Sequence, residues 1–409
     1  MSQQRNSQRV IIIGGSIAGL LAANLFHRIG WDVQVFERAS GVLEGRGAGI
    51  TILPGLVSGF QAAGVNETEE SLGVALPARI ALDRAGNIVA ERPFLQYMTS
   101  WRRLFEALKT ALPSERYHSG VGLECVEQSA ATVTALFTDG QHMDADLLIG
   151  ADGLRSTVRA QFLPELKPFY PGYIAWRCLC DESDLSAATQ ELLFGRYTVC
   201  VPPGEQGIGY AVPGPDHSIE RGKRQFNVVW YTPVREENLP RLMTDDSGRH
   251  HANGIPPSLL SKPVRAEMVE MAKKVLAPQF GEAIGKSKLV FFQPIVDLES
   301  PQLVFGRVVI IGDAAYVARP HVAMGVPKAA GDAIALVKAI QQSGGASAAG
   351  LQAFEAERLR IGSNIIARGR YLGAYMEAQL KSEEERRRAQ EQRFPERVMM
   401  ETAAPWDYE

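Results

Sequence analysis

Six residues near the N-terminus have the types and spacing of a nucleotide-binding turn. The run Gly14-Gly15-Ser16-Ile17-Ala18-Gly19 follows an apolar stretch, residues 10–13, that is typical of a buried strand. It opens a helix expected over residues 17–29. A helix that begins in this way presents free N–H groups and the positive end of its dipole. Both favour a bound pyrophosphate.

A carboxylate follows at the end of the next expected strand. Glu37 lies 18 residues after Gly19, where an acid hydrogen-bonds the ribose hydroxyls of an adenosine and repels a 2′-phosphate. Arg38 weakens that repulsion. Ser16 stands where a second glycine is usual, but it is small enough for phosphate to approach its backbone. An ordinary glycine turn is the alternative, yet strand, turn, helix, strand and acid together favour a dinucleotide site.

Two further motifs indicate which dinucleotide is bound. Asp152-Gly153 is followed by Arg159, and Gly312-Asp313-Ala314-Ala315 follows an apolar strand expected over residues 308–311. In order and approximate spacing, the three elements resemble those of the single-component aromatic hydroxylase flavoproteins, across residues 8 to about 345. The resemblance implies bound FAD, because Rossmann proteins that bind NAD(P)H lack the second and third elements.

The chain departs from the pattern of that family at several positions, which leaves FAD binding intact but changes the expected surroundings of the flavin. The family often has His, Pro, Gly and Asn where this chain has Tyr316, His321, Ala323 and Lys328. Residues 173–177 and 312–332, together with Ser16, are similar to those of the hydroxypyridine monooxygenases within the family.

The resemblance also assigns the cofactor-binding residues. Asp313 is expected to accept a hydrogen bond from a ribityl hydroxyl, and the backbone near Gly325 and Val326 to stabilise negative charge on the reduced flavin. Arg46 is expected to contact the phosphate or ribityl chain, with a solvated loop arginine as the alternative. The full expected set is Gly14, Gly15, Ser16, Ile17, Ala18, Glu37, Arg38, Arg46, Asp152, Gly153, Gly312, Asp313, Pro320, Gly325 and Val326.

Three residues are candidates for the catalytic chemistry. His321 follows Pro320 in the expected flavin-facing segment and has an unperturbed pKa suited to proton exchange, although a structural histidine is the alternative. Arg319 is expected either to orient an anionic substrate or to pair with the C-terminal helices. Tyr210 precedes Pro213-Gly214, where a strand should end near the pocket.

The resemblance implies that NADH or NADPH binds transiently and reduces the flavin, which then reacts with O2 to give a flavin hydroperoxide. That species hydroxylates an electron-rich ring, here a hydroxylated pyridine or a similar N-heteroaromatic. A phenol or phenolic-acid hydroxylase is the alternative within the family. A reductase, a redox-neutral cyclase and a non-catalytic FAD-binding partner protein are the alternatives outside it.

The pattern of elements predicts an α/β fold. We expect a Rossmann-like FAD-binding domain with an inserted, mostly antiparallel sheet domain for the substrate, followed by C-terminal helices. The expected boundaries are 1–167 for the first FAD-binding part, 168–292 for the sheet domain, 293–345 for the second FAD-binding part and 346–409 for the helices. Residues 41–64 are rich in glycine and are expected to be irregular. Two strands, residues 132–137 and 142–149, are expected to form a hairpin at Asp139-Gly140.

The composition of the 409 residues limits the classes of partner. Lys and Arg number 43 against 46 Asp and Glu, which argues against nucleic acid. The longest apolar runs are too short for a membrane span, so a soluble cytoplasmic protein is expected. The four cysteines lack zinc-ligand spacing and are expected to be free thiols, with no metal bound. A homodimer is expected from the family resemblance alone.

Overall fold

One sheet of the molecule carries the glycine-rich turns. The computed structural model describes residues 8–41, 49–252, 254–376, 382–391 and 393–408. Within these residues a six-stranded sheet has the order β17-β18-β10-β1-β2-β6, parallel except for the edge strand β17. Its strands are Val304–Phe305 (β17), Val308–Ile310 (β18), Leu147–Gly150 (β10), Arg9–Ile13 (β1), Asp32–Glu37 (β2) and Tyr117–Ser119 (β6).

The central strands of this sheet are apolar because both faces are covered. Helix α1 (Ile17–Arg28) packs against β1, β2 and the helices α4 (Trp101–Ala111) and α10 (Gly325–Ser343). A three-stranded sheet, β7 (Leu123–Gln128), β8 (Val133–Phe137) and β9 (His142–Ala145), lies near β1 and β10. The strand, helix and strand expected around the first glycine turn are confirmed.

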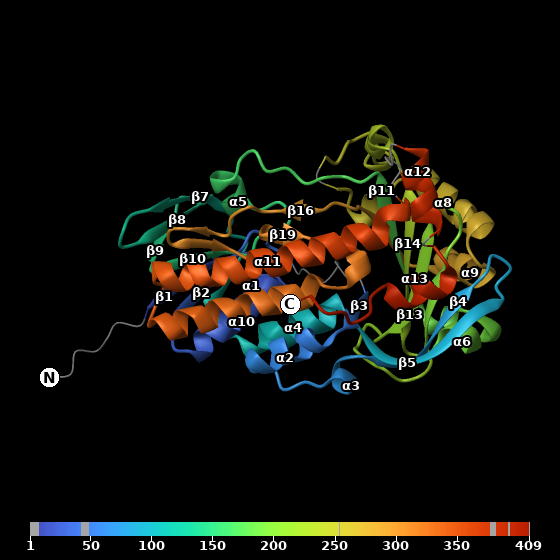
Figure 1. Cartoon of the computed structure of the whole chain (residues 1–409), viewed down its shortest axis with the longest axis horizontal. Helices are drawn as coiled ribbons and strands as arrows, with labels where there is room; N and C mark the ends of the chain where they lie inside the picture. The colour runs from blue at the N-terminus through green and yellow to red at the C-terminus, as the bar shows by residue number, and fades with distance from the viewer. Residues whose placement is uncertain (1–7, 42–48, 253, 377–381, 392, 409) are drawn as a thin grey trace.

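A second sheet forms the other end of the molecule (Figure 1). Its eight strands have the order β15-β11-β14-β13-β12-β4-β5-β3, antiparallel except where β12 meets β4. The strands are Leu289–Pro294 (β15), Tyr173–Asp181 (β11), Gln225–Pro233 (β14), Gln206–Val212 (β13), Arg196–Cys200 (β12), Val74–Leu82 (β4), Ile88–Ser100 (β5) and Gly49–Ile52 (β3). The sheet therefore takes strands from both sides of the expected boundary at residue 168.

The two faces of this second sheet have different neighbours. Side chains that point to one face, such as Trp176 and Phe226, pack in an apolar core with Met268 and Phe280. These come from the helices α8 (Lys262–Val275) and α9 (Pro278–Lys286). The opposite face carries the tyrosines of β11, β12, β13 and β14 and is turned toward the first sheet. The expected, mostly antiparallel sheet is confirmed, and it has one face on an apolar core and the other on the cavity.

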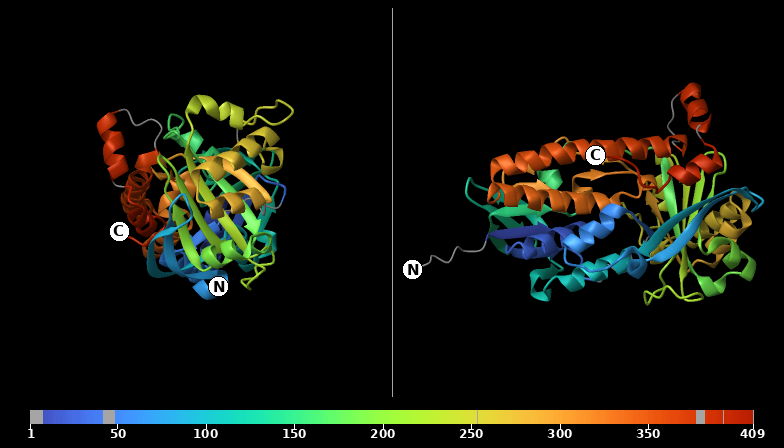
Figure 2. Two further views of the ribbon diagram at one scale, coloured as in Figure 1. Left: turned by 90° about the vertical axis from the view of Figure 1, so that its right-hand side faces the viewer. Right: turned by 60° about the horizontal axis from the view of Figure 1, so that its bottom comes forward.

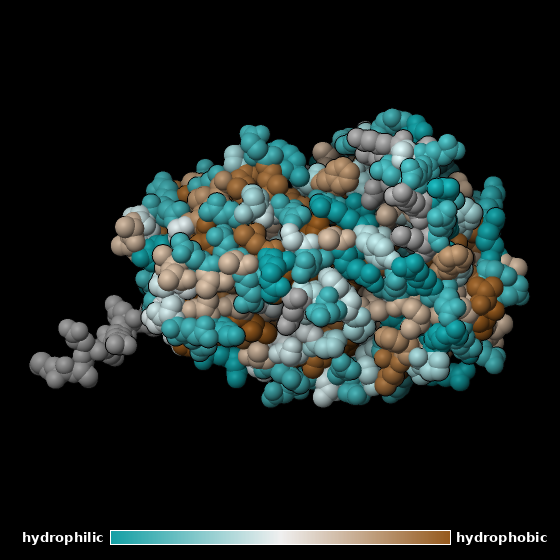
Figure 3. All heavy atoms as spheres, in the orientation of Figure 1, coloured by the Kyte–Doolittle hydropathy of each residue, from teal (hydrophilic) through white to brown (hydrophobic). Residues whose placement is uncertain are grey.

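Two long helices connect the ends of the molecule. Helices α10 and α11 (Ala348–Gly373) lie side by side along its long axis (Figures 1 and 2). The remaining described helices are α2 (Pro54–Ala62), α3 (Glu69–Leu72), α5 (Thr157–Phe162), α6 (Ala187–Leu193), α7 (Leu239–Leu242), α12 (Glu383–Glu391) and α13 (Pro395–Glu401). The short pair β16 (Leu298–Glu299) and β19 (Tyr316–Val317) completes the strands. The face shown in Figure 3 is mainly polar with dispersed apolar side chains.

The fold class expected from the sequence is confirmed, and two local expectations are wrong. Residues 41–64 are not irregular throughout, since they contain β3 and α2. Pro54 at the start of α2 fixes a helical φ, and Leu56 and Phe60 are buried against the rest of the core. The strand expected over residues 142–149 is broken at Asp146, so β9 pairs with β8 while β10 joins the parallel sheet. None of the described helices has both the length and the apolar character needed to cross a membrane.

A buried arginine of the second sheet holds the C-terminal segment. Arg79 of β4 is fully buried and donates hydrogen bonds to the backbone oxygens of Met399 (2.7 Å), Thr402 (2.8 Å) and Ala403 (2.9 Å). These carbonyl groups lie at or just after the C-terminal end of α13, where the helix provides no N–H group to bond them. Thr402 and Ala403 line the cavity described below.

We expect Arg79→Met to lower the free energy of unfolding by about 3 kcal/mol, because several buried carbonyls lose a charged donor at once. Urea unfolding measures this loss. Arg92→Met is the matched control, since Arg92 on the neighbouring strand pairs with Glu396 of the same C-terminal helix at the surface. That exposed pair contributes less than about 1 kcal/mol. Equal losses in the two variants would contradict the role given to Arg79.

A candidate flavin and substrate site between two sheets

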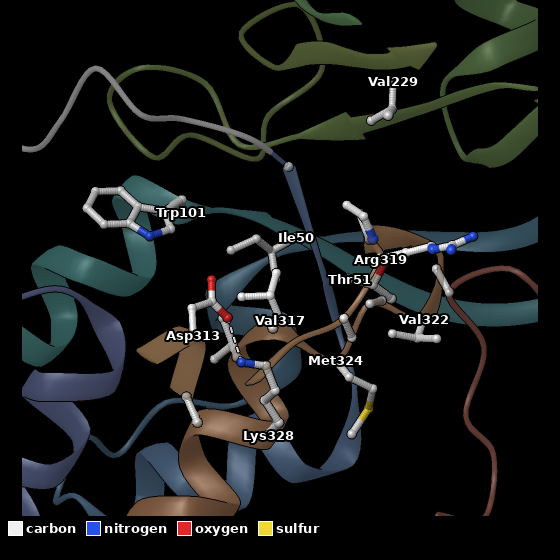
Figure 4. A pocket seen from close by; sticks show the side chains of 18 of the residues that line it. Ile50, Thr51, Trp101, Val229, Asp313, Val317, Arg319, Val322, Met324 and Lys328 are labelled. Atoms are coloured by element: carbon white, nitrogen blue, oxygen red, sulfur yellow. Dashed lines mark hydrogen bonds and ion pairs between the residues drawn. The ribbon is translucent and has the colours of Figure 1, made fainter. Parts of the chain in front are cut away.

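A cavity of about 370 Å³ lies where the two sheets meet. Figure 4 shows Asp313, Val317 and Lys328 on the side of the first sheet and Val229 of β14 across from them. The lining residues come from the glycine turns, from β3 and α4, from the second sheet, from residues 317–329 and from the C-terminal segment. They are Ser16, Ile17, Ala18, Gly49, Ile50, Thr51, Trp101, Ala151, Gly153, Arg177, Tyr197, Ile208, Tyr210, Val229, Tyr231, Gln293, Asp313, Val317, Ala318, Arg319, Pro320, Val322, Ala323, Met324, Gly325, Val326, Lys328, Ala329, Thr402 and Ala403.

The first glycine turn has a conformation that requires glycine. Gly14 has φ +102°, and a Cβ placed on it would lie 2.4 Å from the backbone oxygen of Ala151. Glu37 stabilises the turn, because its carboxylate accepts hydrogen bonds from the N–H groups of Gly15 (2.9 Å) and Ala39 (3.0 Å). The N-cap residue Ser16 makes no side-chain capping bond, so the first N–H groups of α1 stay available beside the cavity.

The second and third motifs are joined through Arg159. Asp152 accepts hydrogen bonds from the N–H groups of Thr157 (2.7 Å) and Val158 (3.3 Å), which fixes the start of α5. Burial raises the pKa of Asp152. The Arg159 guanidinium donates to the backbone oxygen of Ala314 at 2.9 Å, and therefore links the Asp152-Gly153 turn to the Gly312-Asp313 turn.

A buried polar network holds the third turn against the long helices. The N–H of Gly312 donates to Asp332 Oδ2 (2.9 Å), and Asp332 Oδ1 accepts from Tyr316 Oη (2.7 Å) and Arg358 Nε (2.7 Å). Tyr316, where the family often has histidine, thus joins α10 and α11 through Asp332. Each of these groups is satisfied, as a buried network requires.

Asp313 and Lys328 form an ion pair beside the cavity. Lys328 Nζ lies 2.5 Å from Asp313 Oδ1, and Figure 4 marks this contact. The lysine side chain is buried, whereas that of Asp313 is 53% exposed and therefore accessible from the cavity. In the sequence, Lys328 is notable only as a difference from the asparagine that is common in the family. In the structure it forms an ion pair with Asp313, the carboxylate expected to contact a ribityl hydroxyl.

A second helix begins at the cavity. After a turn over Pro320–Val322, Ala323 adopts a left-handed conformation with φ +54°, and α10 starts at Gly325. The N-cap is Met324, which makes no side-chain capping bond, so the N–H groups at Gly325 and Val326 are free to bind a ligand. Two uncapped helix N-termini on one cavity fit a pyrophosphate and a polarised carbonyl edge, which is the chemistry of FAD.

The three candidate catalytic residues lie in different environments. Tyr210 lines the cavity, and its hydroxyl donates to the backbone oxygen of Gly49 at 2.9 Å. Arg319 also lines the cavity, but its Nε donates to Asp297 Oδ2 at 2.9 Å. Asp297 accepts a further hydrogen bond from Arg370 of α11 at 2.8 Å. Arg319 therefore pairs with a carboxylate that it shares with α11, and neither expectation for Arg319 is decided by this contact.

His321 lies behind the cavity wall. It is buried and is not among the residues that line the cavity. Its Nε2 is 3.0 Å from the Tyr173 hydroxyl, and its ring centroid is 4.2 Å from that of Tyr231, which does line the cavity. Burial, with the charge of Arg319, lowers the pKa of His321 well below its usual value, so the ring is neutral at neutral pH.

Several expected cofactor residues are not among those that line the cavity. Gly14, Gly15, Glu37, Asp152 and Gly312 belong to the turns beside it or bond to them. Arg38 is exposed at the end of β2, away from the lining residues. Arg46 lies outside the residues that the structure describes. Sequence reasoning assigned no role to Arg177, Gln293 or the C-terminal residues Thr402 and Ala403, all of which line the cavity. Alternation along β11 could have identified Arg177, but the sequence carries no signal for the C-terminal contact.

The fold and the cavity are those of a two-domain FAD-binding oxidoreductase. Family models described as "FAD binding domain-like" and "FAD binding domain" match residues 170–297 and 299–369. The chain is 30% identical over 362 residues to 2,6-dihydroxypyridine 3-monooxygenase of Paenarthrobacter nicotinovorans, covering 87% of this chain and 88% of that protein. The chain therefore belongs to the FAD-dependent aromatic monooxygenases.

Solved structures show the same architecture. The structure of 2,6-dihydroxypyridine-3-hydroxylase from Arthrobacter nicotinovorans superposes with a TM-score of 0.84 at 27% identity, covering 91% of this chain and 94% of that chain. Klebsiella pneumoniae HpxO complexed with FAD and uric acid has a TM-score of 0.77 at 23% identity, covering 96% and 95%. The cofactor is FAD, and NAD(P)H is the cosubstrate typical of the family.

We expect Gly14→Ala to reduce the affinity for FAD roughly tenfold or more, because the methyl group forces strain of about 1–3 kcal/mol into the turn. Titration of the apoprotein with FAD measures the dissociation constant. Gly41→Ala is the matched control, since a Cβ there meets no atom of the described residues within 4 Å. Unchanged FAD affinity in Gly14→Ala would contradict the close contact with Ala151.

We expect a histidine-dependent loss of stability in mild acid. The pKa of His321 is lower in the folded than in the unfolded chain, so below about pH 6.5 the unfolded chain binds more protons and stability falls. The contribution is at most about 1.4 kcal/mol per pH unit. Urea unfolding at pH 7.5, 6.5 and 5.5 should show a shallower loss for His321→Gln than for the wild-type protein. Parallel pH profiles would show that His321 is not held neutral.

Proposed function

We propose that the enzyme uses NAD(P)H and O2 to hydroxylate a hydroxylated N-heteroaromatic ring of the pyridine type. The observation that carries this proposal is the 30% identity to 2,6-dihydroxypyridine 3-monooxygenase over 87% of the chain. The fold alone does not select a substrate.

The walls of the cavity support an aromatic substrate. Tyr197 and Tyr210 are stacked with ring centroids 5.7 Å apart and an interplanar angle of 7°. Tyr231 and Trp101 also line the cavity, so a flat ring is surrounded mainly by apolar and aromatic surface. Such surroundings exclude water from the reacting ring, as oxygen transfer requires.

The geometry of the turns supports the cofactor roles that the family resemblance implies. In this proposal the uncapped start of α1 binds the pyrophosphate, Glu37 the adenosine ribose and Asp313 a ribityl hydroxyl. The N–H groups of Gly325 and Val326 polarise the carbonyl edge of the flavin ring. When bound, FAD supplies the reaction of reduced flavin with O2, and the chain supplies binding, orientation and a dry cavity.

The candidate catalytic residues take separate roles. Tyr210 touches the substrate from the second sheet, because it lines the cavity while its hydroxyl is held by Gly49. His321 is a positioning residue that holds the rings of Tyr173 and Tyr231 from behind. Arg319 fixes the segment before α10 through Asp297.

The test is an assay of the purified holoenzyme with NADH and with NADPH. We expect 2,6-dihydroxypyridine or 6-hydroxynicotinate to stimulate both cofactor oxidation and O2 uptake, with a product heavier by one oxygen atom. Unsubstituted pyridine is the control and should give no product. Turnover confined to salicylate and 3-hydroxybenzoate would replace the pyridine-type substrate with a phenolic acid. No O2 uptake with any of these rings would contradict the proposal.

A further inference from the structure

Arg177 lies in the middle of the second sheet and faces the cavity. On β11, Trp176 and Cys178 point to the opposite core, so Arg177, which lies between them, points to the cavity face. It pairs with Val229 on β14 and with Phe291 on β15, which places it on an interior strand rather than at the edge of the sheet. Its neighbours on the cavity face include Tyr231 and Gln293.

The guanidinium of Arg177 is buried, and no carboxylate of the described residues pairs with it. The residue is 8% exposed, and its Nε has no hydrogen-bond partner in the part of the chain that the structure describes. Among the described residues, no side-chain acceptor or carboxylate contacts it. An arginine remains protonated in proteins, so it carries a full positive charge into the cavity. Burial of an uncompensated charge is costly and is usually offset by a partner.

The other buried arginines of the described chain all have partners. Arg79 and Arg159 donate to backbone oxygens, Arg319 to Asp297 and Arg358 to Asp332. Arg177 differs from them because it has no such acceptor among the described residues, and the free space beside it is the cavity. Of the two arginines that line the cavity, Arg319 is already neutralised by Asp297.

The charge of Arg177 acts on the groups that surround the cavity. Burial raises the pKa of Tyr210 and of Tyr231, and the positive charge of Arg177 opposes that rise in both. Burial lowers the pKa of His321, and Arg177 contributes to that lowering after Arg319. These three rings come from two strands of the sheet and from the segment before α10, so the charge of Arg177 acts on groups from more than one wall of the cavity.

We propose that Arg177 binds a negatively charged oxygen of the aromatic substrate, and that the substrate enters the cavity as an anion. This inference rests on the proposed function for the ring, but it concerns the charge of the ligand rather than the reaction. The planar guanidinium matches either a deprotonated ring hydroxyl or a ring carboxylate. Either group would supply the negative charge that Arg177 lacks among the described residues.

The proposal has a chemical consequence for a hydroxylated ring. A guanidinium within hydrogen-bond distance of a ring hydroxyl favours its deprotonated form, since an opposite charge lowers the pKa of an acid. A deprotonated oxygen makes the ring richer in electrons, which is the state that an electrophilic oxygen attacks. Arg177 would thus bind the substrate and prepare it, without accepting a proton itself.

The test compares charged and neutral probes of similar shape by titrating the holoenzyme and following the absorbance of its FAD. The pairs are 2,6-dihydroxypyridine with 2,6-dimethoxypyridine, and benzoate with benzamide. We expect the wild-type enzyme to bind the charged member of at least one pair roughly tenfold more tightly or better. Arg177→Gln should reduce that preference to within about twofold, and Arg177→Lys should keep part of it, because the charge remains without the planar fork.

Arg241→Gln is the matched control, because it removes the same charge from an exposed arginine that pairs with Glu267 at the surface. It should bind both probe pairs as the wild-type enzyme does. Arg177→Gln should fold and retain FAD, since replacing an unpaired buried charge does not strand a partner. Its thermal midpoint and flavin content check this.

The outcomes distinguish a ring oxygen from a carboxylate as the group that Arg177 binds. They also distinguish a failure of this inference from a failure of the proposed function. Loss of preference for the dihydroxypyridine alone assigns Arg177 to a ring oxygen, and loss for benzoate alone assigns it to a carboxylate. A wild-type enzyme without charge preference in either pair, including one that binds none of the probes, overturns the inference. A preference retained in Arg177→Gln, or loss of FAD from that variant, also overturns it. Failure to hydroxylate any ring while the preference holds contradicts the proposed function and leaves the anion site standing.

Discussion

One buried carboxylate, Asp297, pairs with one of the two arginines that line the cavity. Asp297 accepts hydrogen bonds from Arg319 and from Arg370, and its backbone exchanges two hydrogen bonds with Phe169. It therefore joins the two ends of the segment from β11 to β15, and it holds α11 against the segment before α10. A carboxylate left without these partners would be strongly destabilising in such a buried position. The same pairing neutralises Arg319, which leaves the charge of Arg177 to be balanced from the cavity.

Close approach of backbone segments makes this arrangement possible. A Cβ on Gly369 would lie 3.2 Å from the backbone nitrogen of Arg319, and one on Gly373 would lie 2.4 Å from the Tyr173 hydroxyl. Helix α11 can therefore contact both the arginine and the tyrosine that positions His321. At the first sheet, Gly14 allows the N-terminal turn to pack on Ala151 in the same way. Small residues at these contacts bring three distant parts of the chain to one cavity.

The sequence predicts what depends on local conformation. The three turns that carry Gly14, Gly153 and Gly312 have positive φ angles, so glycine at fixed positions after a strand was a sufficient signal. Strand β3 and helix α2 were missed because their glycines resemble a loop, while their stability comes from pairing with β5 and packing on the core. Arg79 could not be assigned from sequence, since its carbonyl partners lie more than 300 residues away.

The paired charged residues of the site also have partners that are distant in the sequence, so sequence alone could not assign those partners. Arg319 and Arg177 both stand in apolar surroundings, and only the tertiary contact with Asp297 distinguishes them. His321 belongs to the expected segment, but its ring points into a cluster of tyrosines and burial keeps it neutral. The carboxylate of Asp313 is paired with Lys328. The described lining carries three cationic side chains, Arg177, Arg319 and Lys328, against the single carboxylate of Asp313, so an anionic ring would fit it electrostatically.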